Sequence, residues 1–295
     1  MNSGVTAALL AYGLWGLMPL YFRLMAPATA IEVVAHRIVW SLALLLLWLG
    51  VRGQLGPLWR RLDARLLARL ALAALLVSIN WLTYVWAVTH GRTLDASLGY
   101  FLLPLFNVAL GVLLLGERLT RGEWIGVMLA ALGVGYLALV SPRLPWVALV
   151  LAASFGVYGL VKKQTELPAA EGMALETGLI ALPALAVLGW LATRGQLAFG
   201  QAGAGTDALL ISTGLMTTVP LVAFAVAARR LTLAALGMLQ YISPTLQFLL
   251  GVFVLHEPVD AQRLAGFAAV WLGLLVFSAG AYRRHRTRLR HANAA

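Results

Sequence analysis

Residues 96–119 read ASLGYFLLPLFNVALGVLLLGERL, and a similar pattern returns at residues 236–259 as LGMLQYISPTLQFLLGVFVLHEPV. The two stretches align without a gap at a shift of 140 residues, which pairs Pro104 with Pro244. Apolar helices agree by chance at many positions, but a proline, glycines and a glutamate in one ungapped frame indicate a duplication. The sequence therefore predicts a chain built from two similar halves.

The composition around this repeat is that of a membrane protein. The chain has 295 residues, of which 61% are hydrophobic and 11% charged, and its mean hydropathy is +0.87. A helix needs about 20 mostly apolar residues to cross about 30 Å of hydrocarbon. The sequence predicts an all-α integral membrane protein with ten transmembrane helices, at residues 4–25, 30–50, 66–88, 94–115, 122–140, 145–162, 172–193, 208–228, 233–255 and 262–281.

Basic residues are distributed unequally between the loops. With a cytoplasmic N-terminus, sixteen of the 22 Lys and Arg residues fall in the inner loops and the tail, one falls in each of the five outer loops, and Arg37 lies inside a span. Because positive residues favour the cytoplasmic side, we expect both termini in the cytoplasm of a bacterial inner membrane. The net charge of +11 is then explained by topology and anionic-lipid contacts, and we expect no nucleic-acid partner.

Each half contains five spans, so the second half would enter the membrane upside down relative to the first. We predict a first five-helix repeat at residues 1–141, a second, inverted repeat at 142–282, and a basic cytoplasmic tail at 283–295. In transporters, inverted repeats place the substrate near the midplane between the halves and allow alternating access. Channels and membrane enzymes also contain inverted repeats, so these classes stay open.

Several motifs along the chain resemble one family. They are HRIVWS (36–41), INWLTYVWAV (79–88), LDASLGYFLLPLFNVALG (94–111), LGERL (115–119), YGLVKK (158–163), LETGLIALP (175–183) and TTVPLVAFAVAARRLTLAALGMLQYISPTLQFLLG (217–251). Together they resemble the RarD-like proteins of the EamA family, in the drug/metabolite transporter (DMT) superfamily. The resemblance implies two EamA repeats of five helices and export of small metabolites or drugs. RarD-like proteins are linked by name to chloramphenicol sensitivity, and the related YddG type exports aromatic and other amino acids.

Three polar residues, Glu32, His36 and Arg37, stand at the outer start of the second span. A carboxylate at a helix N-terminus is favourable without any function. Arg37 lies roughly 10 Å deeper, where its side chain either extends back to water or faces the protein interior or a wet cavity. Glu32 and Asp95 are its candidate partners on this side.

His36 corresponds to Glu176 at the same shift of 140 residues, which would place the two at opposite mouths of one path. An unperturbed histidine titrates near pH 6.5, so direct ligand contact, gating and proton coupling are all open for this pair. Pro104 and Pro244 are candidate hinges, with a static kink as the alternative. We expect these four residues and Arg37 to act in gating or coupling.

Glycines in the fifth and tenth spans recur at roughly helical spacing, where they let backbones approach closely. These positions are Gly126, Gly133, Gly266 and Gly273. They predict helix packing, or a surface for a weak homodimer, and the oligomeric state stays open between a monomer and such a dimer.

Aromatic and amide side chains gather in the remaining spans. A site that binds an apolar or aromatic side chain by stacking, and meets amino and carboxylate groups with amides and hydroxyls, would use this chemistry. Interface anchoring and packing are the alternative roles. The candidate substrate-binding residues are Trp15, Asn80, Tyr84, Tyr100, Tyr158, Gln240 and Tyr241.

Enzyme signatures are missing from the sequence. It contains no cysteine, HExxH motif, P-loop or nucleophile elbow, so we expect neither catalysis nor a cofactor or metal. The leading hypothesis is a secondary transporter that exports small metabolites, most simply aromatic and other apolar amino acids. A chloramphenicol-type drug exporter is the alternative, and an intramembrane enzyme, a lipid scramblase or a channel are alternatives of different classes.

Overall fold

The computed structural model describes residues 3–56, 63–115, 119–140, 145–163, 165, 167–231 and 239–292. Ten helices and no strands form in this part of the chain, as the hydropathy pattern predicts. They are α1 (Ser3–Arg23), α2 (Ala30–Val51), α4 (Ala64–Thr89), α5 (Thr93–Leu115), α6 (Arg121–Val140), α7 (Trp146–Lys163), α8 (Ala169–Thr193), α9 (Ala204–Arg230), α11 (Ile242–Phe253) and α12 (Ala261–Ala292). Of the predicted span 233–255, residues 233–238 lie outside the described part.

The helices have the lengths and surfaces of membrane spans. Within the described residues, six of them (α1, α2, α4, α8, α9 and α12) are long and apolar enough to cross a bilayer, and α7 and α11 contribute shorter apolar helices. Large apolar side chains such as Leu47, Leu139 and Leu182 are more than half exposed on the outside of the bundle. An exposed apolar surface of this kind suits contact with lipid. The chain is therefore a multi-pass membrane protein.

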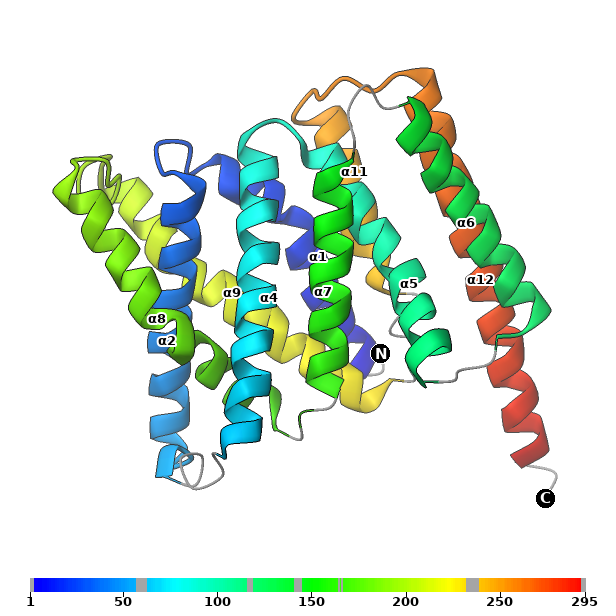
Figure 1. Ribbon diagram of the computed structural model, residues 1–295, viewed down its shortest axis with the longest axis horizontal. Helices are drawn as coiled ribbons and strands as arrows, with labels where there is room; N and C mark the ends of the chain where they lie inside the picture. Colours follow the sequence, from blue (N-terminus) through cyan, green and yellow to red (C-terminus); the bar gives the residue numbers. More distant parts are fainter. Residues whose placement is uncertain are drawn as a thin grey trace.

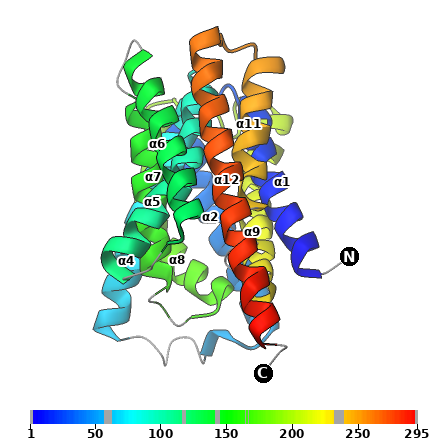
Figure 2. The same cartoon turned by 90° about the vertical axis from the view of Figure 1, so that its right-hand side faces the viewer.

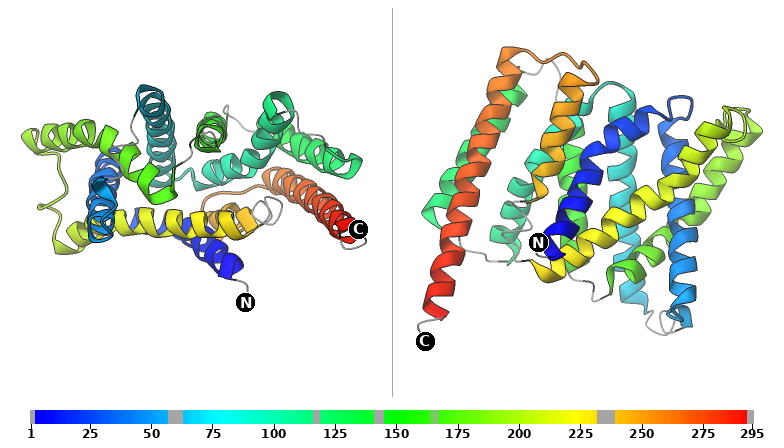
Figure 3. Two further views of the ribbon diagram at one scale, coloured as in Figure 1. Left: turned by 90° about the horizontal axis from the view of Figure 1, so that it is seen from below. Right: turned by 180° about the vertical axis from the view of Figure 1, so that it is seen from behind.

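The helices pack in two interleaved groups, and successive helices run in alternate directions (Figure 1). Helix α7 packs against α4 and α5, whereas α1 packs against α9 and α11. The end-on view separates these two groups (Figure 3, left), and Figure 2 shows α1 beside α11. Helices α2 and α8 pack together at one end of the molecule and α6 and α12 at the other. Each group thus combines helices that are far apart in the sequence.

Glycines explain the close approach of α6 and α12. A Cβ atom added to Gly126 would lie 2.5 Å from the backbone nitrogen of Phe277, and one added to Gly273 would lie 2.4 Å from that of Ala130. The two backbones are in contact at these positions, which leaves no room for a side chain. The predicted glycine faces therefore pack against each other within one chain.

The prolines take different positions in the helices. Pro19, Pro183 and Pro220 lie inside α1, α8 and α9. Pro244 instead lies in the first turn of α11, where the missing N–H leaves no helical bond unmade, and its carbonyl accepts a hydrogen bond from Ser97 Oγ at 2.8 Å. Pro104 falls within α5, but its side chain lies outside the described residues.

Candidate functional site

Arg37 is the charged centre of the site. It lies two turns into α2 and is only 6% exposed. Its Nε donates to Thr217 Oγ1 of α9 at 3.1 Å. Its guanidinium carbon lies 4.4 Å from the centroid of the Trp81 ring and 5.3 Å from that of Phe22, at distances where cation–π attraction operates. Aromatic faces and one hydroxyl thus surround a buried cation.

The two carboxylates expected beside Arg37 are used elsewhere. Asp95 forms an ion pair with Arg92 at 2.7 Å. Glu32 Oε1 accepts hydrogen bonds from the backbone N–H groups of residues 198–199, in the loop between α8 and α9, at 2.9 and 3.0 Å. Neither forms an ion pair with Arg37. Both candidate partners of Arg37 are therefore bonded to other groups.

A series of contacting aromatic rings begins at Phe22, whose ring lies against the Arg37 guanidinium, and continues through the interior of the bundle. Centroids of successive rings lie 5.9, 5.5, 6.4 and 5.5 Å apart, within the range of favourable aromatic contact. We call this series the aromatic column. In order, its members are Phe22, Tyr84, Tyr100, Phe155 and Tyr158, contributed by α1, α4, α5 and α7.

A second ion pair lies at the far end of the aromatic column. Glu176 of α8 accepts from Lys162 Nζ at 2.6 Å through Oε1 and from the Tyr158 hydroxyl at 3.1 Å through Oε2. Glu176 is 2% exposed, whereas the Lys162 side chain is 25% exposed. The column therefore joins a buried guanidinium at one end to a lysine–carboxylate pair at the other.

Asn80 fixes the middle of the aromatic column. Its Nδ2 donates to the carbonyl of Leu151 and to Ser154 Oγ, both at 3.1 Å, and its Oδ1 accepts from the Tyr100 hydroxyl at 3.2 Å. The side chain is fully buried. Asn80 thus ties α4 to α5 and α7 and sets the position of Tyr100.

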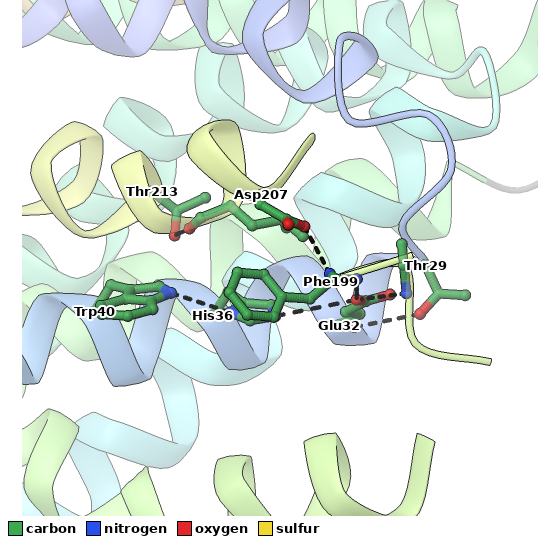
Figure 4. A network of polar contacts seen from close by, with 10 residues as sticks. Thr29, Glu32, His36, Trp40, Phe199, Asp207 and Thr213 are labelled. Carbon is green, nitrogen blue, oxygen red and sulfur yellow. Dashed lines mark hydrogen bonds and ion pairs between the residues drawn. The ribbon is translucent and has the colours of Figure 1, made fainter. Parts of the chain in front are cut away.

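His36 belongs to a network near the N-terminal end of α2 (Figure 4). Trp40 Nε1 donates to His36 Nδ1 at 3.1 Å. Because an indole N–H only donates, Nδ1 accepts, and a neutral His36 ring carries its proton on Nε2. Nε2 lies 4.0 Å from Glu32 Oε1, and the Phe199 ring lies 4.9 Å from the imidazole, centroid to centroid. This network joins α2 to the α8–α9 loop.

The other predicted wall residues lie outside the aromatic column. Trp15 packs against Tyr12 and Phe224, with ring centroids 5.8 Å apart in both pairs, and its carbonyl accepts from Gln247 Nε2 at 3.1 Å. Tyr241 packs on the apolar cluster of α5, α6, α11 and α12 and lines a small, partly open pocket there. Gln240 is partly buried just before α11.

Sequence reasoning did not select five residues that the structure brings into the site. They are Phe22, Trp81, Phe155, Lys162 and Thr217. Lys162 could have been predicted from the sequence, because it lies one helical turn beyond Tyr158 and on the same face. The others are aromatic or hydroxyl side chains that resemble ordinary packing residues in an apolar helix.

A bundle of apolar helices around a polar and aromatic interior defines a multi-pass membrane protein. The EamA-like transporter family matches residues 2–139. Protein RarD of Streptomyces exfoliatus is 46% identical over 288 residues, which cover 96% of this chain and 91% of the relative. The transporter YojE of Bacillus subtilis is 42% identical over 282 residues, 94% of each chain. The chain belongs to the EamA-like transporter family and is a membrane transporter.

Two further comparisons extend this result. A protein of Pseudomonas aeruginosa named chloramphenicol-sensitive protein RarD is 35% identical over 280 residues, 93% of each chain. A crystal structure of a protein with 18% identity superposes with a TM-score of 0.65 over 94% of this chain and 97% of that one. The second likeness shows a common fold.

Proposed function

We propose that this transporter is a secondary carrier that exports small metabolites across the bacterial inner membrane by alternating access, most simply amino acids with aromatic or other apolar side chains. The observation that carries the proposal is the aromatic column, which leads from Arg37 at one end to Glu176 and Lys162 at the other. Rings bind apolar side chains by stacking and area burial, while charges at the ends attract the polar groups of an amino acid.

The proposal includes two inverted five-helix repeats, at residues 1–141 and 142–282. The packing of the helices supports it. Helix α1, first in the first half, packs on α9 and α11 of the second, and α7, first in the second half, packs on α4 and α5 of the first. This exchange of equivalent helices is what a two-fold relation between the halves would produce, with the substrate path between them.

Movement of the halves requires contacts that can open. At the end of the molecule where α2 begins, Glu32 ties α2 to the α8–α9 loop, and Glu257 accepts from the backbone N–H groups of Thr93 and Leu94 at 2.8 and 2.9 Å. At the opposite end of the aromatic column Lys162 bonds Glu176. Alternate breaking of these two sets of bonds would open the path to each side in turn, with Pro104 and Pro244 as candidate hinges.

Proton coupling is part of the proposal. Glu176 and His36 lie at opposite ends of the site, and His36 Nε2 is buried with no hydrogen-bond partner among the described residues. Gain or loss of a proton at either residue would change its bonds to Lys162 or Glu32. Transport by His36→Ala and Glu176→Gln proteins, measured between pH 5.5 and 8, should lose its pH dependence. An unchanged pH profile in both would remove protons from the mechanism.

The central experiment is counterflow into proteoliposomes with unlabelled substrate trapped inside. The labelled panel contains phenylalanine, tryptophan, methionine, threonine and chloramphenicol, each with and without a pH gradient. We expect saturable amino-acid counterflow that falls by about tenfold or more in Tyr84→Ala, since this removes a buried ring of the column. Tyr136→Ala is the matched control, because Tyr136 is 39% exposed on α6.

Chloramphenicol transport is the second candidate function, favoured by the name of the Pseudomonas aeruginosa relative. Counterflow of chloramphenicol with no movement of any amino acid would replace the amino-acid proposal with a drug exporter. Single-channel currents without saturable exchange would instead indicate a channel.

A further inference from the structure

We infer that Arg37 is the receptor for a carboxylate of the transported molecule, which it binds together with the hydroxyl of Tyr84. The inference rests on the proposed function for the route by which such a molecule arrives. It implies that a ligand of this site needs an anionic group attached to an apolar part.

The first observation is a buried charge without a counter-ion. A cation within a membrane span is costly unless it is paired or faces water. No carboxylate among the described residues forms an ion pair with Arg37, and the two candidate partners, Glu32 and Asp95, are bonded to other groups. A chain that keeps an arginine here without a partner leaves its charge available to a ligand.

The second observation is that hydrogen-bond donors of Arg37 and Tyr84 are unused. Within the described residues only Nε of Arg37 forms a hydrogen bond, to Thr217, so both terminal nitrogens keep their donors free. The hydroxyl of Tyr84 is also buried without a hydrogen-bond partner in this part of the chain. The Phe22 ring lies 5.3 Å from the guanidinium carbon and 5.9 Å from the Tyr84 ring, centroid to centroid, so both groups with unused donors border the same ring. A buried donor without an acceptor is unfavourable.

The geometry suits a carboxylate in particular. A guanidinium presents a planar fork whose parallel N–H groups match the two oxygens of a carboxylate. Trp81 and Phe22 hold the guanidinium by its faces, and Thr217 holds Nε, which leaves the terminal edge of the fork for the ligand. The Tyr84 and Tyr100 rings, 5.5 Å apart, continue from this point and would contact the apolar part of the ligand.

This arrangement separates classes of ligand. Amino acids and aryl carboxylates can satisfy the fork and contact the rings, whereas amines, amides and chloramphenicol lack a carboxylate. Removal of one partner of a buried charged hydrogen bond leaves the other unpaired, so we expect loss of the carboxylate to weaken binding by about 30-fold or more.

The test is a binding cycle on the full chain in detergent, read as the ligand-dependent rise in unfolding temperature. Its four probes are phenylalanine, 3-phenylpropionate, phenylalaninamide and phenethylamine, of which only the first two have a carboxylate. The proteins are wild type, Arg37→Gln and Arg37→Lys. Arg92→Gln is the control, because Arg92 is paired with Asp95. Circular dichroism and size-exclusion chromatography check that each variant is folded, and Arg37→Lys keeps the charge if Arg37→Gln does not fold.

We expect the two carboxylate probes to stabilise the wild-type and Arg92→Gln proteins. Arg37→Gln should lose the difference between phenylalanine and phenylalaninamide, and Arg37→Lys should keep part of it, since an ammonium is a point charge without the fork. The inference is overturned if phenylalaninamide binds the wild type as tightly as phenylalanine, if Arg37→Gln and Arg37→Lys both retain the full preference, or if Arg92→Gln loses it equally.

Parallel counterflow assays separate this inference from the proposed function. Carboxylate binding at Arg37 without counterflow would keep the inference and overturn the carrier. Counterflow that ignores both the carboxylate and Arg37 would keep the carrier and overturn the inference. A wild-type protein that none of the four probes stabilises at millimolar concentration would overturn the inference and the amino-acid proposal together.

Discussion

Asn80 connects three helices through one buried amide. Its bonds to Leu151, Ser154 and Tyr100 use both ends of the amide, so its role in the site is to position the Tyr100 ring rather than to offer a free group. A buried polar network of this kind rigidifies its surroundings when every member is bonded.

Replacement of Asn80 therefore tests a positioning role against direct contact with substrate. We expect Asn80→Ala to lower the free energy of unfolding by about 1–3 kcal/mol, because it leaves buried partners without their bonds. Thermal unfolding in detergent measures this, and Tyr100→Phe should show a smaller loss. Ser78→Ala is the control, since its hydroxyl bonds the carbonyl of Ala74 within the same helix, α4. Unchanged stability with weaker ligand binding would instead make Asn80 a ligand contact.

Helix starts show how one sequence pattern gives two structures. Both α2 and α6 begin with Thr-x-x-Glu, the pattern of a capping box. At α6, Thr120 and Glu123 bond reciprocally within the first turn. At α2, Thr29 caps the helix, but Glu32 turns outward and bonds the α8–α9 loop. The loop decides the difference, because its N–H groups lie within reach of only one of the two glutamates.

Because the two glutamates bond different groups, replacing each by alanine should affect different parts of the molecule. Glu32→Ala should detach the α8–α9 loop and speed amide hydrogen exchange at residues 198–199 by about tenfold or more, since two backbone N–H groups lose their acceptor. Glu123→Ala should leave the α8–α9 loop protected, because Glu123 bonds Thr120 at the start of α6. Hydrogen exchange followed by mass spectrometry measures both, and protection of the loop in Glu32→Ala would argue against its attachment through this carboxylate.

The α6–α12 pair depends on missing side chains. We expect Gly273→Ala to lower the unfolding temperature by several degrees, because its Cβ would overlap the backbone of α6 and separate the helices. Gly135→Ala, where a Cβ meets nothing within 4 Å, should leave stability equal or slightly higher. Equal effects of the two changes would show that α6 and α12 do not need this close contact.

At the scale of the whole molecule, the two sequence halves are interleaved. Helices α1 and α7 each pack among helices of the other half, so neither half has a core of its own. The site draws residues from α1, α2, α4, α5, α7, α8 and α9. Motion between the halves would therefore act directly on the aromatic column.

The orientation of the molecule can be tested with single cysteines, because the chain contains none. Gln201 and Gln54 are both exposed, and the positive-inside rule assigns them to the outer and inner sides respectively. We expect an impermeant maleimide to label Gln201→Cys in intact cells with an opened outer membrane. Gln54→Cys should react only after the inner membrane is permeabilised. The reverse pattern would invert the topology.

Hydropathy by itself determined the ten helices and the membrane class, because a span in lipid must satisfy its own backbone and expose apolar side chains over a fixed length. The motifs determined the family, and residue types determined that Arg37, Glu176 and several tyrosines deserved notice. Tertiary structure decided their partners. Whether Arg37 meets Asp95 or Thr217, and whether Asn80 faces a ligand or Ser154, depends on which helices pack together. These contacts join residues distant in sequence, and helical periodicity states only which residues share a face.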